Sequence, residues 1–532
     1  MSGDYAYVIV GSGVAASTVA TKLLERNPAT SILMLEAGPT IPMKDRRYWW
    51  DYVLYGRKPY DSCEDRNADN PSVGSTPWLS KGSRSMMYGG STAHWGGWSM
   101  RFKPEDFHLK TNTGRGGDWP YGYDILEPYY CRADDYLSVC GDDNDSADRS
   151  DPAGTSNRND PWRSKPYPMP PYPWTESDGE MIQAFRALGI TPGRMPLARY
   201  RKCMATGTCK YCPFGARFCG SFVLDDLLSE PRYMNFEFIG MAPVTRLVAE
   251  SKSRIRAVEY TDPVTGATII ASGATIILCA GAYEVPKLLM RSCSYHWQNG
   301  IGNDHDLVGR YAISHPFLSV LGTKDTNEER WIQEFDFPTL MSRTYDTEAY
   351  QSNGKIFLMK SAMFPNVDLA GHMIAGKDRS AIDGIVTGPR QVQLSAFMEE
   401  MGQYENRFSP GEGTTHLGLP RTRIRFSHPS DFRERAERNL DLMEAVIRQM
   451  GYTVGKNNRV IGEQDGHHTS STCRMGKDPS EGVVDADLKV FGTDNLYVCS
   501  NAVHPTCAAV NPTLTLVAVT LKLTDHLLSL SP

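Results

Sequence analysis

The stretch that decides the fold is YAYVIVGSGVAA, residues 5–16. Its first six residues are apolar and rich in β-branched and aromatic side chains, which predicts a short buried strand. A glycine-rich turn follows, then a predicted helix over residues 15–26 and a second apolar run over residues 31–35 that ends at Glu36. Strand, glycine turn, helix, second strand and acid in this order are typical of a dinucleotide-binding fold.

Each residue type in this turn has a separate expected role. Gly11 permits the tight turn, Gly13 lets a pyrophosphate approach the backbone, and Ala16 lets the helix pack closely on the strand. The phosphates would meet the helix N-terminus, where free N–H groups and the helix dipole favour anions, and Glu36 would accept hydrogen bonds from ribose hydroxyls. This fingerprint does not by itself distinguish FAD from NAD.

Length and composition set the wider limits. The chain has 532 residues, enough for two intertwined domains with a sizeable core. Its net charge of −6 gives no basic surface of the kind that nucleic acid requires, so we expect no nucleic-acid partner. We find no run of about eighteen apolar residues and no secretory signal before the first strand. These features predict a cytoplasmic protein without a membrane segment, or a periplasmic one if a partner subunit carries it out folded.

Further motifs recur along the chain in a fixed order. A glycine-rich aromatic loop spans residues 82–97, and WPYGYDILEPYY spans residues 119–130. HHTSSTCRMG and NPTLT follow at residues 467–476 and 511–515. Together with the N-terminal fingerprint, these motifs resemble the glucose-methanol-choline (GMC) oxidoreductases, FAD enzymes that oxidise alcohols. The resemblance is greatest to the bacterial sugar and polyol dehydrogenases and to the pyranose oxidases.

The resemblance and the chain order imply an α/β fold with two interleaved domains. A Rossmann-like FAD-binding domain would comprise residues 1–105, 200–320 and 455–532, and a substrate domain built on an antiparallel sheet would comprise 106–199 and 321–454. Segments 355–360, 391–397 and 422–426 have β-strand patterns suited to that sheet, and residues 432–450 predict an amphipathic helix. Residues 141–180, rich in Asp, Asn, Ser and Pro, predict an irregular excursion that is a lid, an oligomer arm, a partner-docking surface or a solvated insertion.

The expected chemistry centres on a histidine. An alcohol is oxidised when a base takes its hydroxyl proton and a carbon-bound hydride passes to the flavin N5, and histidine suits the role of base because its ordinary pKa is about 6.5. By motif match, His468 is the base and Asn511 is the partner that holds the substrate hydroxyl against it. His467 would exchange roles with His468 if the motif register slipped by one, and His504 is expected to lie behind the site.

The resemblance implies further contacts with FAD. Val244 would present its backbone to the adenine, and His94 matches the histidine that forms a covalent bond to flavin in pyranose oxidases, with an unbonded histidine packed beside the flavin as the alternative. The remaining residues implied as cofactor-binding are Gly89, Gly90, Asn501, Pro512 and Thr513.

Four of the twelve cysteines crowd into a short segment: Cys203, Cys209, Cys212 and Cys219. Cysteine thiolates bind iron–sulfur clusters or zinc. The sugar dehydrogenases of the family carry a three-cysteine site for a 3Fe-4S cluster at the corresponding place, although the last two cysteines here are one residue closer. A 3Fe-4S cluster is therefore favoured, and a 4Fe-4S cluster, a structural zinc, local disulfides or a metal-free loop stay open as alternatives.

These patterns together predict FAD-dependent oxidation of an alcohol substrate, a sugar or polyol, to a carbonyl. Electrons would pass to a cytochrome or quinone and not to NAD, with a small partner subunit. One alternative is an oxidase of the pyranose type, which would reduce oxygen to hydrogen peroxide. Another is a lyase of the same family, in which the flavin is structural.

Overall fold

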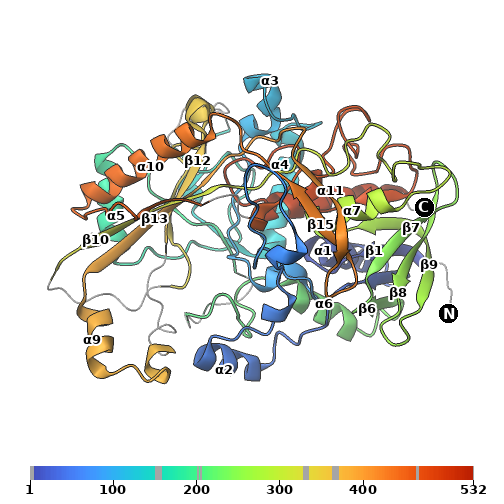
Figure 1. Cartoon of the computed structure of the whole chain (residues 1–532), viewed down its shortest axis with the longest axis horizontal. Helices are drawn as coiled ribbons and strands as arrows, with labels where there is room; N and C mark the ends of the chain where they lie inside the picture. Colours follow the sequence, from blue (N-terminus) through green and yellow to red (C-terminus); the bar gives the residue numbers. More distant parts are fainter. Residues whose placement is uncertain are drawn as a thin grey trace.

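The computed structural model describes residues 5–149, 158–199, 203, 207–326, 335–361, 371–462 and 466–530. Two sheets organise these residues (Figure 1). A first sheet lies in the half that holds both chain ends, and a second sheet lies in the opposite half. This arrangement confirms the predicted mixed α/β fold.

The first sheet has a parallel centre and an antiparallel side. The parallel centre runs β6-β2-β1-β9-β17, and the antiparallel strands β8 and β7 extend from β9. The bounds of these strands are β1 Tyr5–Val10, β2 Ile32–Leu35, β6 Phe236–Ile239, β7 Val244–Ala249, β8 Ile255–Thr261, β9 Thr268–Leu278 and β17 Leu496–Val498. The predicted strand over residues 5–10 is therefore present, at the centre of the sheet.

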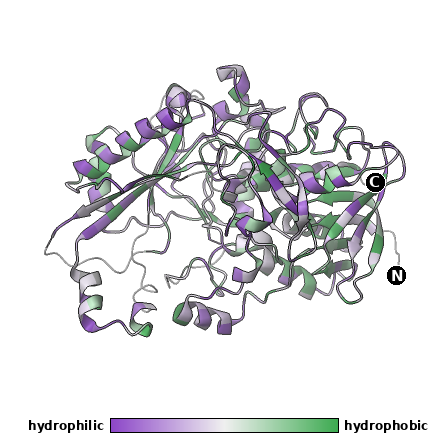
Figure 2. Ribbon diagram, in the orientation of Figure 1, coloured by the Kyte–Doolittle hydropathy of each residue, from purple (hydrophilic) through white to green (hydrophobic). Residues whose placement is uncertain are grey.

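Helices bury this parallel centre, which explains its continuous apolar sequence. Helix α1 (Val14–Arg26) follows β1 and contacts α11 (Thr513–Leu530), which also contacts α4 (Tyr123–Leu137). Val8 and Ile9 of β1 are fully buried. In Figure 2 the hydrophobic residues gather in the strands and enclosed helices of this half.

The second sheet is antiparallel and runs β16-β10-β13-β12-β11-β4. Helix α10 (Phe432–Gln449) lies on it and contacts β10, β13 and α5 (Asp178–Ala187). The apolar side of α10, which includes Leu440, Met443 and Val446, packs into a separate core, as the helical periodicity predicts. The strand bounds are β4 Gly193–Arg194, β10 Phe317–Lys324, β11 Leu340–Ser342, β12 Ile356–Lys360, β13 Arg390–Met398 and β16 Arg459–Gly462.

Two predicted details differ from the structure. The segment at 422–426 lies in β15 (Pro420–Arg425), which pairs with β14 (Arg407–Thr414) in a separate ribbon and not with the second sheet. Strand β16 belongs to the second sheet although we assigned residues 455–532 to the FAD-binding domain, and the domain boundaries stay predictions. In both cases the difference lies in which strands pair in the folded chain. The alternation of apolar and polar residues predicts a strand but does not identify the strand with which it pairs.

The remaining elements are short, and the predicted excursion is largely irregular. In the described part of residues 141–180, the regular structure is one 3₁₀ turn, Asp143–Asp145, and the beginning of α5 at Asp178, so the last three residues of the predicted excursion are helical. The other bounds are α2 Arg46–Tyr55, α3 Leu109–Thr113, α6 Gly220–Ser229, α7 Gly281–Arg291, α9 Arg379–Thr387, β3 Val139–Cys140 and β5 Leu197–Ala198.

Helix α11 is long and apolar enough to cross a membrane by length and composition. It was not predicted from the sequence because threonines and three late polar residues, Lys522, Asp525 and His526, interrupt the apolar run. Of its apolar window, 61% is buried inside the structure. A buried core helix passes the same test, so this helix is weak evidence for a membrane span.

Candidate active site

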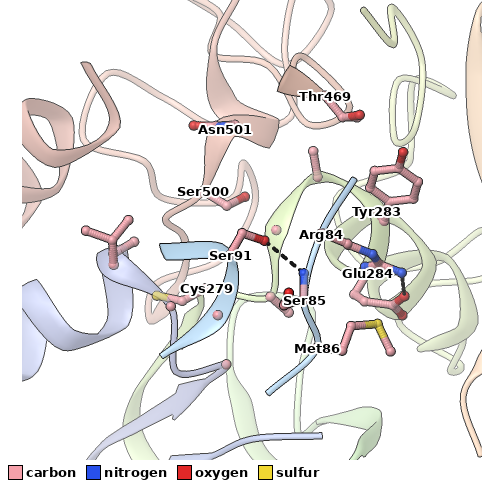
Figure 3. A pocket seen from close by; sticks show the side chains of 18 of the residues that line it. Arg84, Ser85, Met86, Ser91, Cys279, Tyr283, Glu284, Thr469, Ser500 and Asn501 are labelled. Carbon is pink, nitrogen blue, oxygen red and sulfur yellow. Dashed lines mark hydrogen bonds and ion pairs between the residues drawn. The ribbon is translucent and has the colours of Figure 1, made fainter. Parts of the chain in front are cut away.

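A cavity of about 660 Å³ reaches from the glycine turn after β1 to the predicted catalytic pair. Its size lies within the range of small-molecule and cofactor sites. The lining comes from the β1–α1 turn, the glycine-rich aromatic loop, α7 and the C-terminal segments. Figure 3 shows this convergence, with Arg84 and Met86 from the loop, Glu284 from α7, and Thr469 and Asn501 from the C-terminal segments.

The glycine turn has a geometry that other residues would disturb. Gly11 has φ +99°, and a Cβ there would lie 2.8 Å from the carbonyl oxygen of Cys279. Gly90 has φ +60°, and a Cβ there would lie 2.9 Å from the Cα of Gly13. Because a Cβ on Gly13 would meet nothing within 4 Å, the turn leaves open space at the N-terminus of α1. This is the arrangement that an anion-binding helix start requires.

Glu36 lines the cavity and also holds the turn. Its carboxylate accepts hydrogen bonds from the Ser12 backbone N–H at 3.0 Å, the Ser12 hydroxyl at 2.7 Å and the Gly38 backbone N–H at 2.9 Å. Burial raises the pKa of Glu36, and these hydrogen bonds oppose that shift. The carboxylate therefore orders the turn in addition to its predicted role toward a ribose.

A buried ion network joins the glycine-rich loop to α7. The Arg84 guanidinium donates to Glu284 at 2.9 Å, as Figure 3 shows. Arg84 also donates to Asp65 at 2.6 Å, and Lys287 lies 2.8 Å from Glu284. Burial favours the neutral acid, but Lys287 and Arg84 together lower the pKa of Glu284 to about 2. Glu284 is therefore ionised at neutral pH and holds the cavity wall together.

His94 stands on the wall of the same cavity. Its Nδ1 lies 2.8 Å from the Ser85 hydroxyl, and its ring centroid lies 6.3 Å from that of His467. Burial lowers the pKa of His94 to about 3, and His467 and Arg217 act in the same direction. The imidazole is therefore neutral and oriented by Ser85.

The predicted catalytic pair is in hydrogen-bond contact. The Nε2 atom of His468 lies 2.9 Å from Nδ2 of Asn511, and both side chains line the cavity. Burial lowers the pKa of His468, and the neighbouring His315 and His467 lower it further. His467 also lines the cavity but is more exposed. The structure thus brings His468, rather than its neighbour, to Asn511.

An aromatic floor lies beside this pair. Phe397 of β13 has its ring centroid 4.7 Å from that of His468. Phe317 of β10 and Trp98 pack on Phe397 at 5.5 and 6.0 Å, and all three line the cavity. The Nε1 atom of Trp98 is buried without a hydrogen-bond partner in the described residues. This end of the cavity can stack on an apolar face and donate one hydrogen bond.

Neither this floor nor His315 was predicted from the sequence. A phenylalanine in a strand pattern gives no signal that separates a cavity wall from a core position. His315 is a lone histidine before a proline, with no motif around it. Only the tertiary fold brings these residues to His468.

Most predicted cofactor residues line the cavity: Gly11, Gly13, Glu36, Gly90, His94, Val244, Asn501 and Thr513. Ala16, Gly89 and Pro512 lie behind the lining. Ala16 is fully buried in the helix–sheet core, and the Gly89 N–H donates to the Ser12 hydroxyl at 3.1 Å. His504 is also fully buried, packed against Phe102 and Trp119 outside the cavity lining.

The four cysteines do not form one group. Cys203, Cys209 and Cys212 border a separate small cavity, whereas Cys219 is buried elsewhere, with its sulfur 3.0 Å from the Ser221 hydroxyl. Among the described residues, no three His, Cys, Asp or Glu side chains are placed to hold a metal ion. The predicted four-cysteine ligand set is therefore not assembled, because the chain after Cys212 carries Cys219 to the start of α6.

Comparison with known families gives two matches. Two family models described as GMC oxidoreductase match the chain, the N-terminal one at residues 174–317 and the C-terminal one at residues 411–520. The second match contains His468 and Asn511.

Similar proteins cover almost the whole chain at low identity. The fructose dehydrogenase large subunit of Gluconobacter japonicus is 25% identical, with 98% of this chain and 97% of the relative covered. Paromamine 6'-oxidase of Streptomyces fradiae is 24% identical, with 97% and 90% covered. A crystal structure of pyridoxine 4-oxidase from Mesorbium loti superposes with a TM-score of 0.66 at 19% identity, covering 98% of this chain and 99% of that one. These relatives include both dehydrogenases and oxidases.

Proposed function

Because this chain belongs to the GMC oxidoreductase family and is an oxidoreductase acting on CH–OH donors, we propose that it oxidises a hydroxyl of a sugar or polyol to a carbonyl. The observation that carries the proposal is one continuous cavity that joins a dinucleotide turn to the pair His468 and Asn511. FAD, the cofactor that family membership supports, would accept the hydride at its N5.

The residues at the far end of the cavity would handle the proton. His468 Nε2 would take the hydroxyl proton of the substrate, since a neutral imidazole has a lone pair on one nitrogen. Asn511 would hold the substrate oxygen within reach of His468, which fixes the carbon-bound hydrogen in one orientation. The lowered pKa of His468 keeps the base neutral and ready at ordinary pH.

The aromatic floor and the relatives both support a sugar-like substrate class. Phe397, Phe317 and Trp98 offer flat apolar surfaces that suit the C–H face of a sugar ring, and Trp98 Nε1 would donate to a second hydroxyl. Relatives named for fructose and for paromamine support a sugar-like substrate.

The electron acceptor is proposed to be a cytochrome or quinone rather than NAD, in line with a relative named as a large subunit, which also supports a small partner subunit. Reduction of oxygen, as in the relatives named oxidases, is the second candidate. The iron–sulfur hypothesis gains no support from the described residues, because Cys203, Cys209 and Cys212 border one small cavity but are not placed to hold a metal ion. No step of the reaction is assigned to a metal.

Anaerobic mixing of the purified holoenzyme with a panel of sugars and polyols tests the proposal. We expect at least one sugar to bleach the oxidised flavin band, and re-oxidation by a quinone or dye to be faster than by air. In His468→Ala, with full FAD content, the rate of flavin reduction should fall by roughly 10²- to 10⁴-fold.

His467→Ala serves as the comparison, because the 2.9 Å contact with Asn511 is made by His468. It should lose less than about tenfold of the rate of flavin reduction. If no alcohol bleaches the flavin, the result would favour the lyase alternative. Equal losses of rate in His468→Ala and His467→Ala would contradict the assignment of His468 as the base.

A further inference from the structure

A second buried histidine stands directly behind the predicted base. His315 is 1% exposed and lies just before β10. Its Nδ1 is 2.8 Å from Nδ1 of His468. Its other ring nitrogen, Nε2, lies 3.0 Å from the carbonyl oxygen of Ala508 and 3.2 Å from that of Cys507.

These contacts determine where the ring protons sit. Carbonyl oxygens only accept hydrogen bonds, so the Nε2 atom of His315 carries a hydrogen. A neutral imidazole carries one N–H, so Nδ1 of His315 has the lone pair and must accept from Nδ1–H of His468. The lone pair of His468 is then on Nε2, the atom that faces Asn511 and the cavity.

The amide orientation of Asn511 agrees with this chain of hydrogen bonds. Its Nδ2, a donor, is the atom 2.9 Å from His468 Nε2. The reverse tautomer of His468 would need an acceptor at that position. It would also need N–H groups on both nitrogens of His315, and therefore a buried positive charge.

Backbone pairing fixes the distance between the two rings. The Ser470 N–H donates to the Ile313 carbonyl at 2.9 Å, and the Ile313 N–H donates back to the Ser470 carbonyl at 3.3 Å. The His468 N–H donates to the Ser314 hydroxyl at 3.1 Å. The two histidines are thus held by one short stretch of antiparallel pairing, so their contact does not depend on flexible side chains alone.

We propose that His315 is a positioning residue that sets the tautomer of His468 and stabilises the imidazolium formed during alcohol oxidation. This inference rests on the proposed function, because it assigns a partner to the proposed base. In this role Nε2 of His468 would take the substrate hydroxyl proton, and FAD, when bound, would supply the acceptor for the carbon-bound hydride. Nδ1–H of the resulting cation then makes a charge-assisted hydrogen bond to Nδ1 of His315. His467 and the thiol of Cys507, whose sulfur lies 3.8 Å from the His468 carbonyl oxygen, are titratable groups that also lie near His468.

Two substitutions in the holoenzyme test this role. His315→Leu removes the acceptor, and His315→Asn keeps an acceptor oxygen near the position of Nδ1. With the sugar that reduces the wild type fastest, we expect His315→Leu to lower the limiting rate of flavin reduction by roughly 100-fold, with half-saturation changed by less than about threefold. His315→Asn should restore at least about tenfold of that loss.

A solvent deuterium isotope effect on flavin reduction gives a readout that a purely structural role would not change. It should increase in His315→Leu, because removal of the hydroxyl proton becomes slow. His504→Leu is the matched control, since it removes another fully buried imidazole outside the cavity lining, and it should leave the rate within about twofold of the wild type.

Several results would overturn the proposal. One is a His315→Leu holoenzyme that reduces its flavin within about threefold of the wild-type rate, and another is a His315→Asn variant as slow as His315→Leu. If His315→Leu does not fold, nitrogen NMR of the wild-type protein with ¹⁵N-labelled histidine decides. A hydrogen on Nδ1 of His468 supports the proposed hydrogen bond from His468 to His315, and a hydrogen on Nε2 refutes it. If His468→Ala lost its rate of flavin reduction and His315→Leu did not, the role of His315 alone would be refuted and the proposed function would be unaffected.

Discussion

The contact between Gly90 and Gly13 gives a quantitative test of how the cofactor cradle is built. Gly90 has φ +60°, and a Cβ at this position would lie 2.9 Å from the Cα of Gly13. Carbon atoms in contact are normally about 3.5–4.0 Å apart. In Gly90→Ala the glycine-rich loop would therefore have to move away from the turn by at least about 0.5 Å.

Two costs are expected in this variant. A left-handed backbone costs a non-glycine residue about 1–2 kcal/mol of unfolding free energy. The displacement of the loop costs binding free energy, because it widens the cradle in which the phosphates would lie. Gly114→Ala is a matched control, because Gly114 lies at the surface with φ +72°, and a Cβ there would meet nothing within 4 Å. Both variants should lose about 1 kcal/mol or more of unfolding free energy.

Only Gly90→Ala should lose cofactor affinity. Titration of apoprotein with FAD, followed by quenching of flavin fluorescence, should show a Kd increased about tenfold or more, which corresponds to about 1.4 kcal/mol. Gly114→Ala should bind FAD as the wild type does. If Gly90→Ala bound FAD with unchanged Kd and lost only the stability that Gly114→Ala loses, the close approach of loop and turn would have no role in cofactor binding.

Three further outcomes are expected. Because burial lowers the pKa of His468, the proposed base stays neutral at pH values below the ordinary histidine pKa of about 6.5. The rate of flavin reduction, measured by stopped flow, should therefore stay level as the pH falls through about 6.5 and decline only at lower pH. Glu284→Gln should destabilise the protein by about 3 kcal/mol or more in denaturant unfolding, since Lys287 would remain buried without its carboxylate, whereas Glu25→Gln on the surface should cost less than about 0.5 kcal/mol. If Cys203, Cys209 and Cys212 hold a cluster, the purified wild type should contain iron and acid-labile sulfide, and Cys209→Ser should lose both. A wild-type protein without iron would contradict the cluster.

Covalent attachment of FAD to His94 is tested independently of these. His94 is neutral and held by Ser85 at the cavity wall, so it retains a lone pair for bonding. If the bond forms, acid precipitation should leave the yellow colour in the protein pellet, and His94→Ala should release it to the supernatant. A yellow supernatant from the wild type would exclude the bond.

The sequence predicted the local elements around the turn because their signals are local. Strand β1 begins and ends where the apolar run does, and α1 begins one residue before the prediction. The motif match also brought His468 and Asn511 together correctly, although 43 positions separate them. Local periodicity and a strong motif were sufficient for these features.

The rest depends on which strands pair, and that information is not local. His315 precedes His468 by 153 positions, and nothing in its neighbourhood marks it. Phe397 reaches His468 because β13 pairs with β10 inside the second sheet, and these strands lie far apart in the sequence. The prediction for the cysteine segment was wrong for the opposite reason. The short spacing in the sequence suggested one common site for all four cysteines, but the turn into α6 separates Cys219 from the other three.

The position of His468 follows from the junction of the two sheets. Strands β10 and β16 pair in the second sheet as far as Phe317 and Gly462, and the pairing resumes between Ile313 and Ser470, beside the two histidines. On the other side, Asn511 closely precedes α11, which packs on α1, the helix whose N-terminus faces the proposed phosphate site. The second sheet therefore places His468, and the first sheet with its helices places both the glycine turn and Asn511. The distance between His468 and Asn511 consequently depends on how the two halves are docked, so a substitution that shifts this docking should slow the proposed removal of the proton.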